Sequence, residues 1–164
     1  MSDVSTPCRE AALKLLDRTR RTRRDLERRL KEKDFDAATI AATLDRLAEV
    51  GLVDDVEYAR AWLAGRWGRR PSGWRRLQQE LRGKGVSQED AEKARELLSE
   101  RGSAPDEVES AAKLVAQARK RYSKLEPHVQ RQRLYALLAR RGYDSGVIRR
   151  ALEIEEPLES GAES

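Results

Sequence analysis

The sequence predicts an all-α protein of three tandem three-helix repeats, each of a helix-turn-helix type, arranged as an elongated array. The first observation behind this prediction is a five-residue phrase that occurs three times with the same internal spacing. The second is that apolar residues recur at helical spacing in every substantial segment, whereas no segment alternates as a strand would. The third is composition, because 38% of the 164 residues are charged and only 5% are aromatic. Such a chain carries apolar material for several thin cores, so each repeat is expected to depend on its neighbours for stability.

The repeated phrase consists of two leucines four residues apart, a basic residue, a turn residue and an apolar residue. Its copies are Leu26, Leu30, Lys33, Asp34 and Phe35; Leu77, Leu81, Lys84, Gly85 and Val86; and Leu134, Leu138, Arg141, Gly142 and Tyr143. A left-handed residue at a helix end costs glycine little, so Gly85 and Gly142 suit this position and Asp34 suits it less well. The apolar residue that follows is expected to fold back over the leucines and to close its repeat.

Repeat 1 is predicted for residues 8–53. Apolar residues mark its three helices: Ala11, Leu13, Leu15 and Leu16 in the first, Leu26 and Leu30 in the second, and Ile40, Leu44 and Leu47 in the third. Asp36 is placed to cap the N-terminus of the third helix, and Gly51 is placed to end it.

Repeat 2 is predicted for residues 54–102. Its helices are marked by Tyr58, Ala59, Trp62 and Leu63; by Trp74, Leu77 and Leu81; and by Ala91, Ala94, Leu97 and Leu98. The pair Asp54 and Asp55 precedes the first of these helices, which favours N-capping over a metal or acid–base site. The segment 68–73, which contains Pro71, is expected to break this helix before Ser72 or Gly73 leads into the next. Ser87 is placed to cap the third helix.

Repeat 3 is predicted for residues 103–154, after a short joint in which Pro105 is tolerable at a first helical position. Asp144, just after Gly142, is placed to cap its final helix. Residues 155–164 are acidic and poor in apolar side chains, so they are expected to form a disordered tail.

A net charge of +5 favours polyanions or an acidic protein surface as the partner. We expect partner contacts from three clusters of mostly basic residues: Arg20, Arg21, Arg24 and Arg28; Arg66, Trp67, Arg69, Arg70, Arg75 and Arg76; and Arg119, Arg121, Lys124, Arg131 and Arg133. Guanidinium groups suit phosphate or carboxylate pairs, and neighbouring aromatic rings could stack on unpaired bases.

The alternative is that these arginines form solvated helix faces and that the tryptophans belong to the core. For the first cluster this alternative stays open, because Asp17, Asp25, Glu27 and Glu32 lie close in sequence. The second cluster contains no acidic residue and the third has only Glu126 beside it, so a binding role is favoured for both.

Cys8 is the only cysteine and His128 the only histidine, which excludes disulfides and the usual zinc ligand sets. We find no nucleophile with a base, no paired acids in a cleft and no P-loop, so neither catalysis nor a cofactor is expected. The chain has no apolar run long enough to span a membrane, and a monomeric, cytoplasmic protein is expected.

Two stretches of the chain resemble the RecX family, regulators of the RecA recombinase. One is the string Gly51-Leu52-Val53-Asp54-Asp55 followed by Tyr58-Ala59, Trp62, Gly73, Leu77, Glu80-Leu81 and Lys84-Gly85-Val86. The other is the opening segment with Ala12, Leu15-Leu16, Arg18, Arg24, Leu26, Leu30 and Lys33. The resemblance covers residues 11–98 well and the third repeat mainly through its helical pattern. Asp34 departs from the family's usual glycine, and Tyr58 stands where phenylalanine is common.

The resemblance implies a curved array of nine helices without catalytic activity, which binds the RecA filament on DNA along its groove. Members of the family restrain filament extension and the ATPase, strand-exchange and coprotease activities of RecA in recombination, DNA repair and the SOS response. Binding of single- and double-stranded DNA also goes with the family. The alternative is a sequence-nonspecific DNA-binding protein built of helix-turn-helix-like repeats, which would bind bare DNA with a steep salt dependence.

Overall fold

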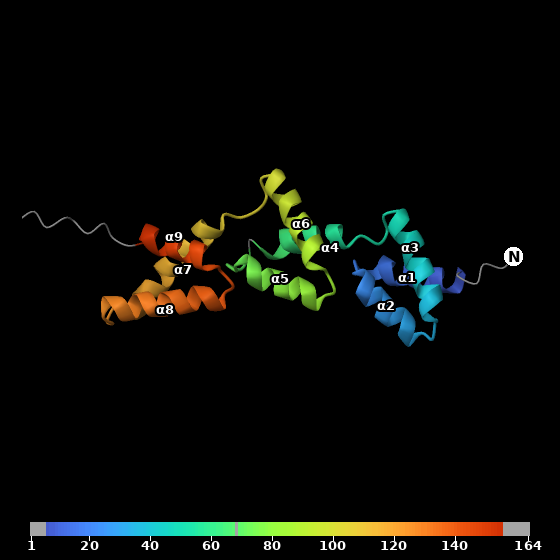
Figure 1. The fold of residues 1–164 in the computed structure, drawn as a ribbon, viewed down its shortest axis with the longest axis horizontal. Coiled ribbons are helices and arrows are strands. Elements are labelled where there is room, and N and C mark those ends of the chain that lie inside the picture. The colour runs from blue at the N-terminus through green and yellow to red at the C-terminus, as the bar shows by residue number, and fades with distance from the viewer. Residues whose placement is uncertain (1–5, 68, 156–164) are drawn as a thin grey trace, which may run out of the picture. The chain divides into compact units, whose positions relative to one another are not determined.

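The computed structural model describes residues 6–67 and 69–155, and this part of the chain forms nine α-helices and no strand (Figure 1). The predicted all-α class is therefore confirmed. Of the tail predicted for residues 155–164, Glu155 is the last residue of the final helix, and the rest lies outside the described residues.

The described residues fall into two compact units. The first contains the residues up to Ala64 together with Glu80–Gly102, and the second contains Gly65–Gln79 together with the residues from Ser103 onward. The boundary passes through helix α5 (Trp74–Gly83), which contributes its start to the second unit and its end to the first.

The first unit is built from α1 (Thr6–Arg18), α2 (Arg23–Glu32), α3 (Ala37–Glu49), α4 (Asp55–Arg66) up to Ala64, the end of α5, and α6 (Gln88–Glu100). Helices α1, α2 and α3 pack against one another. They enclose a core of Cys8, Ala12, Leu26, Leu30, Ile40, Leu44, Leu47 and Val53. The paired leucines of the first repeated phrase, Leu26 and Leu30, are both fully buried there, as the periodicity predicts.

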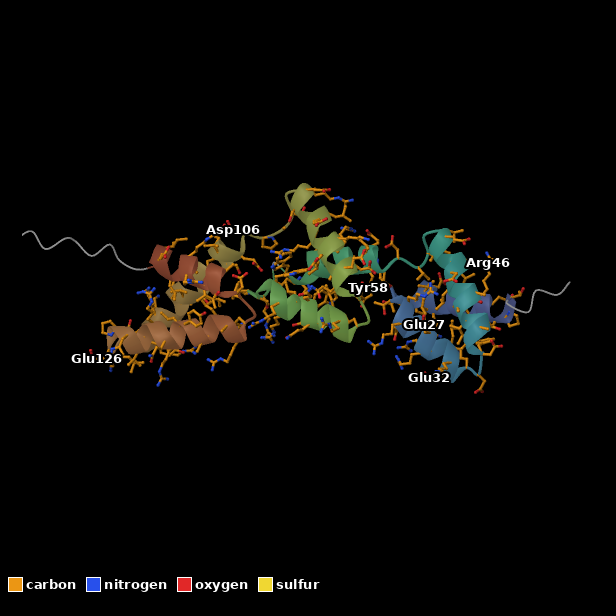
Figure 2. All side chains as sticks on the ribbon, in the orientation of Figure 1. Glu27, Glu32, Arg46, Tyr58, Asp106 and Glu126 are labelled. Atoms are coloured by element: carbon orange, nitrogen blue, oxygen red, sulfur yellow. The ribbon has the colours of Figure 1, made fainter. Side chains whose placement is uncertain are left out.

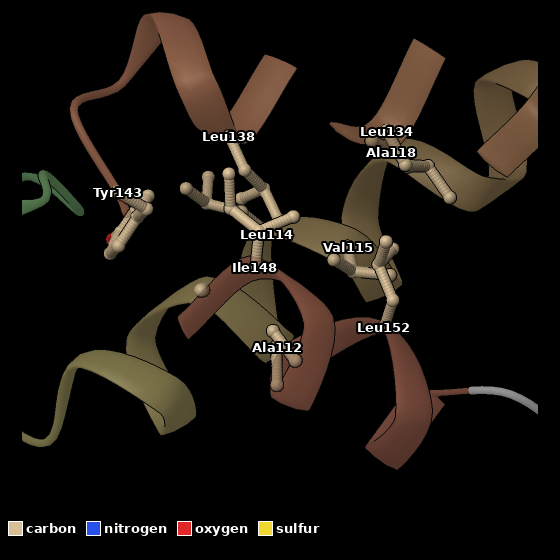
Figure 3. Packing of buried hydrophobic residues seen from close by; sticks show 11 residues of the cluster. Ala112, Leu114, Val115, Ala118, Leu134, Leu138, Tyr143, Ile148 and Leu152 are labelled. Carbon is tan, nitrogen blue, oxygen red and sulfur yellow. The ribbon is translucent and has the colours of Figure 1, made fainter. Parts of the chain in front are cut away.

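The second unit contains α7 (Glu107–Tyr122), α8 (Pro127–Arg140) and α9 (Ser145–Glu155) together with the start of α5. Figure 3 shows its core, in which Leu134 and Leu138 of α8 face Leu114 and Val115 of α7. Tyr143, the apolar residue of the third phrase, is only 1% exposed. Its hydroxyl lies 2.7 Å from Ser110 Oγ, so this aromatic ring is buried with its polar atom hydrogen-bonded.

The three repeated phrases end their helices in the same way. The turn residues Asp34, Gly85 and Gly142 have φ values of 66°, 98° and 89°, which confirms a left-handed residue in each copy. The amide of the following apolar residue donates to the carbonyl of the second leucine over 3.3 Å, 3.0 Å and 3.2 Å respectively. This is the Schellman arrangement, and it brings Phe35, Val86 and Tyr143 back over the leucines as predicted.

Most helix starts also follow the sequence prediction. Asp36 and Ser87 accept hydrogen bonds from backbone amides of α3 and α6, and Asp144 Oδ1 accepts from Val147 N at 2.9 Å. Helix α7 begins at Glu107, so Pro105 lies in the predicted joint before it. Asp106 caps this helix, since its Oδ1 accepts hydrogen bonds from the amides of Val108 and Glu109.

Each unit contains a junction, defined here as the contact between the start of one phrase-bearing helix and the end of another. In the first unit Thr22 Oγ1 donates to the carbonyl of Lys84 at 2.7 Å, and Asp55 Oδ1 accepts from Arg23 N at 2.9 Å. In the third phrase Arg141 corresponds to Lys84, and its backbone carbonyl also accepts a hydrogen bond in the second unit.

In the second unit Gly73 N donates to the carbonyl of Arg141 at 2.9 Å, and Glu107 Oε1 accepts from Trp74 N at 2.7 Å. Asp55 and Glu107 are each the first residue of their helix, so the two junctions use the same elements. The chain therefore repeats its inter-helix contacts as well as its helices.

Candidate functional site

The first unit contains a groove of about 1030 Å³, which we call the N-terminal groove. It is lined by Thr19, Arg20, Arg21, Thr22, Arg24, Asp25, Glu27, Arg28, Lys31, Ala37, Ile40, Ala41, Tyr58, Gly83 and Lys84. Six of these side chains are basic and two are acidic. All four residues predicted for the first cluster, Arg20, Arg21, Arg24 and Arg28, are therefore brought to one surface.

Asp25 organises several of the arginines around the groove. Its carboxylate receives hydrogen bonds from Arg21 and Arg28 at 2.9 Å and from Arg29 at 3.1 Å. Burial opposes ionisation of Asp25, but the three guanidinium groups outweigh it and lower the pKa of Asp25 to about 2. This carboxylate therefore stays charged at neutral pH and fixes the arginines that it binds.

Of the other four basic residues of the groove, one lies beside a carboxylate and three do not. Arg20 lies 3.5 Å from Glu57, but Arg24, Lys31 and Lys84 are exposed and have no ion pair among the described residues. Lys84 Nζ lies 6.0 Å from the centroid of the Trp62 ring. Three cations thus remain available for an anionic partner.

The sequence prediction did not include Lys31, Lys84 or Tyr58. Tyr58 and Glu27, labelled in Figure 2, come from different helices and both line the groove. The Tyr58 side chain is partly buried, and burial, together with the charges of Asp25 and Asp55, raises the pKa of its hydroxyl. Only the fold brings Lys84 close to the α2 residues.

The second predicted cluster lies around the start of α5 in the second unit. Trp67 is 5% exposed, and its ring centroid lies 5.7 Å from that of Trp74. Arg66 donates to Ser72 Oγ at 3.3 Å, and Arg75 donates to the carbonyl of Ala139 at 3.2 Å. These residues help to fix the loop before α5, which does not favour direct stacking of the Trp67 ring on a partner. Of the remaining members, Arg69, Arg70 and Arg76 are exposed.

The third predicted cluster lies on the last turn of α7, the loop after it and the first half of α8, and we call it the C-terminal cluster. Its members Arg121, Lys124, Arg131 and Arg133 are exposed, whereas Arg119 is partly buried. Lys120, which belongs to the same basic stretch of the sequence, is also exposed. The Arg133 guanidinium lies 6.0 Å from the centroid of the Tyr122 ring. Glu126, labelled in Figure 2, precedes α8 and makes no side-chain capping bond.

Within residues 6–67 and 69–155, no group of histidine, cysteine, aspartate or glutamate side chains is arranged to hold a metal ion. In the same residues, no helix is both long and apolar enough to cross a membrane. Tandem three-helix repeats with basic surfaces define a class of helical-repeat proteins.

Comparison with known proteins places the chain within this class. The first, second and third three-helix domains of RecX match residues 8–47, 54–94 and 105–152, in that order. The chain belongs to the RecX family of regulatory proteins.

Two relatives and one solved structure show the extent of the similarity. The regulatory protein RecX of Thermobifida fusca is 35% identical over 159 residues, which cover 96% of this chain and 82% of that protein. RecX of Chlorobium phaeobacteroides is 33% identical over 144 residues, covering 88% of this chain and 90% of that protein. The crystal structure of RecX from Lactobacillus salivarius superposes with a TM-score of 0.82 and 22% identity, covering 94% of this chain and 97% of that one. This last likeness shows the shared fold.

Proposed function

We propose that this chain is a non-catalytic regulator that binds the filament of RecA recombinase on DNA. It lies along the filament groove and restrains filament extension, and with it the ATPase, strand-exchange and coprotease activities that serve recombination and DNA repair. It acts as a cytoplasmic monomer without a cofactor. The repeats span residues 8–53, 54–102 and 103–154.

The observation that carries this proposal is the match of three RecX domains in their proper order along one chain. The cationic surfaces of both units support it, because a filament of protein and DNA offers carboxylates as well as phosphates. A protein that binds one filament conformation more tightly than another, or that bars subunit addition, shifts the polymer without performing chemistry.

The test adds the purified protein to RecA assembling on single-stranded DNA. Growth of fluorescently labelled filaments and ATP hydrolysis are followed together, and both are expected to slow as the added protein is raised. The proposal fails if growth, hydrolysis and strand exchange are unchanged at concentrations that saturate binding to the filament.

Charge reversal at Arg69 and Arg70 tests the second cluster separately. Both side chains are exposed, whereas Arg66 and Arg75 bond to other parts of the second unit and their loss would also disturb its structure. Weaker filament binding by the Arg69→Glu/Arg70→Glu variant would assign a contact to this loop. Unchanged binding would remove the loop from the site and leave the regulator proposal intact.

The C-terminal cluster favours a second candidate function, sequence-nonspecific DNA binding. Its exposed cations suit the phosphates of a nucleic-acid backbone. The affinity for an oligothymidylate is measured at several salt concentrations with the native chain and with Arg121→Glu/Lys124→Glu/Arg131→Glu. Loss of three phosphate contacts lowers the salt slope by about 2. Tighter binding to the RecA filament than to bare DNA at equal salt supports the regulator, and equal binding supports the DNA-binding protein.

A further inference from the structure

We propose that the N-terminal groove is the docking site for an acidic peptide segment that also carries apolar side chains. This inference deepens the proposed function, and it rests on that function only for the protein that supplies the segment. The competing occupant is a nucleic-acid strand, which the lining of the groove suits less well.

The available cations come from two elements that meet only in the folded chain. Arg24 and Lys31 lie on α2, and Lys84 follows the last residue of α5. All three are exposed and none is paired with a carboxylate among the described residues. Carboxylates spaced along an extended segment can pair with each of them in turn.

Fixed acids in the lining disfavour a continuous phosphate backbone. Asp25 and Glu27 line the same groove, and Asp25 stays ionised at neutral pH. The cations beside them are also engaged, since Arg21 and Arg28 already bind Asp25. A strand with a charge at every nucleotide would place phosphates close to these acids, and like charges in an interface are unfavourable. A peptide can place an uncharged residue at that point.

Three aliphatic residues of α3 line the groove beside the charged ones. They are Ala37, Ile40 and Ala41. An aliphatic side chain of a peptide removes its surface from water by packing there. Single-stranded nucleic acid is bound instead through exposed aromatic faces, and the aromatic ring in this lining, Tyr58, is partly buried.

The C-terminal cluster provides the contrast within the same chain. It presents Arg121, Lys124 and Arg131 as exposed cations, with Arg133 close to the Tyr122 ring. Its exposed cations suit phosphates, whereas the groove combines cations, fixed acids and three aliphatic residues of α3. The two surfaces therefore select different chemistry.

The experiment measures the binding of a fluorescein-labelled peptide in which pairs of glutamates alternate with leucines. Fluorescence anisotropy is recorded with the full chain, with Lys31→Glu/Lys84→Glu, and with the matched control Lys93→Glu/Lys113→Glu. The two control lysines pair with Glu89 and Glu109 on helix surfaces and do not line the groove. Two further peptides replace every glutamate by glutamine or every leucine by serine. An oligothymidylate is titrated with the same three proteins.

Reversal of the two groove lysines is expected to weaken peptide binding about tenfold, because two exposed attractions become repulsions. The control variant is expected to bind the peptide as the native chain does, and both peptide replacements are expected to bind more weakly. Oligothymidylate binding is expected to change less than peptide binding in the groove variant. Circular dichroism confirms that the variants remain folded.

The inference is overturned if the groove variant loses oligothymidylate binding and keeps the peptide, since the groove is then a nucleic-acid site. It is also overturned if the groove and control variants bind the peptide equally well, or if the serine peptide binds as tightly as the leucine peptide. Loss of peptide binding by the groove variant, with unchanged restraint of RecA filaments, would support the groove assignment and show that the segment belongs to another protein. Failure of the native chain to affect RecA filaments would remove the proposed function without removing the peptide site.

Discussion

The junction in the second unit allows a strong test, because one methyl group there should reverse the usual effect of a glycine-to-alanine change. A Cβ atom at Gly73 would lie 2.2 Å from the backbone carbon of Gly142 and 2.3 Å from the amide nitrogen of Tyr143. Gly73 does not have a left-handed backbone, so alanine meets no conformational penalty there. The entire cost of Gly73→Ala therefore comes from the contact.

The expected loss of stability can be worked from this geometry. The two backbone segments must separate by roughly 1 Å before the methyl group reaches ordinary contact distance. Overpacking of this kind costs about 1–3 kcal/mol. The movement also weakens the bond from Gly73 N to Arg141 O and the bond from Trp74 N to Glu107, each worth about 1 kcal/mol. We expect Gly73→Ala to lower the free energy of unfolding by about 3 kcal/mol.

The assay is urea unfolding followed by tryptophan fluorescence, to which Trp67 and Trp74 of the same unit contribute. The control is Gly65→Ala in α4, where a Cβ atom meets nothing within 4 Å. This change should stabilise the protein by about 0.5–1 kcal/mol, since alanine is the better helix former. If Gly73→Ala is neutral or stabilising like Gly65→Ala, the close approach of Gly73 to Gly142 does not exist and the junction is wrong.

Three further predictions concern single side chains. Because its folded pKa of about 2 lies below the unfolded value, Asp25 contributes stability above about pH 4 that is lost as pH falls toward 2. Asp25→Asn should therefore cost about 1 kcal/mol at pH 7 and almost nothing at pH 2, and equal costs in thermal melts at both values would contradict the arginine cluster. Asp36→Ala removes the N-cap of α3 and should cost about 1 kcal/mol by urea unfolding, while Asp36→Ser should restore most of it. Tyr143→Phe and Ser110→Ala each break one partly buried hydrogen bond and should each cost about 1 kcal/mol, and additive losses in the double variant would show that the bond is absent.

The local features of the fold were predictable because their physical causes lie within a few residues. A left-handed turn residue after two leucines predicts a helix end wherever it occurs, and Asp34, Gly85 and Gly142 all behave this way. Capping follows from short-range bonds as well, so Asp36 and Asp144 were identified correctly. Pro105 lies in the joint predicted before repeat 3, and Asp106, just after it, caps α7.

The junctions and part of the candidate site could not be predicted, because they depend on residues far apart in the chain. Thr22 and Lys84 are 62 residues apart, and Trp74 and Glu107 are 33 apart. The sequence indicated that Asp54 and Asp55 cap a helix, but only the fold shows that Asp55 bonds to Arg23 N while Asp54 Oδ1 accepts from Glu57 N.

The groove shows the same limit. Its arginines are adjacent in sequence and were recognised as a cluster, whereas Lys84 and Tyr58 reach it through the fold. The density of basic residues in the sequence also did not indicate which of them pair with carboxylates in the fold. Arg21 and Arg28 are bound to Asp25, and the Trp67 ring is buried beside Trp74.

The difference between Asp34 and the two glycines at equivalent positions bears on self-association. A Cβ atom at Gly85 would lie 2.7 Å from Arg24 Cβ, and one at Gly142 would lie 2.5 Å from Arg76 Cβ, so both junctions need a bare backbone at this point. Asp34 has the same backbone but carries a charged side chain. A second copy that docked on this helix end as the internal junctions do would have to accommodate the Asp34 side chain. A head-to-tail contact that does not close propagates into fibres, and the Asp34 side chain disfavours that route.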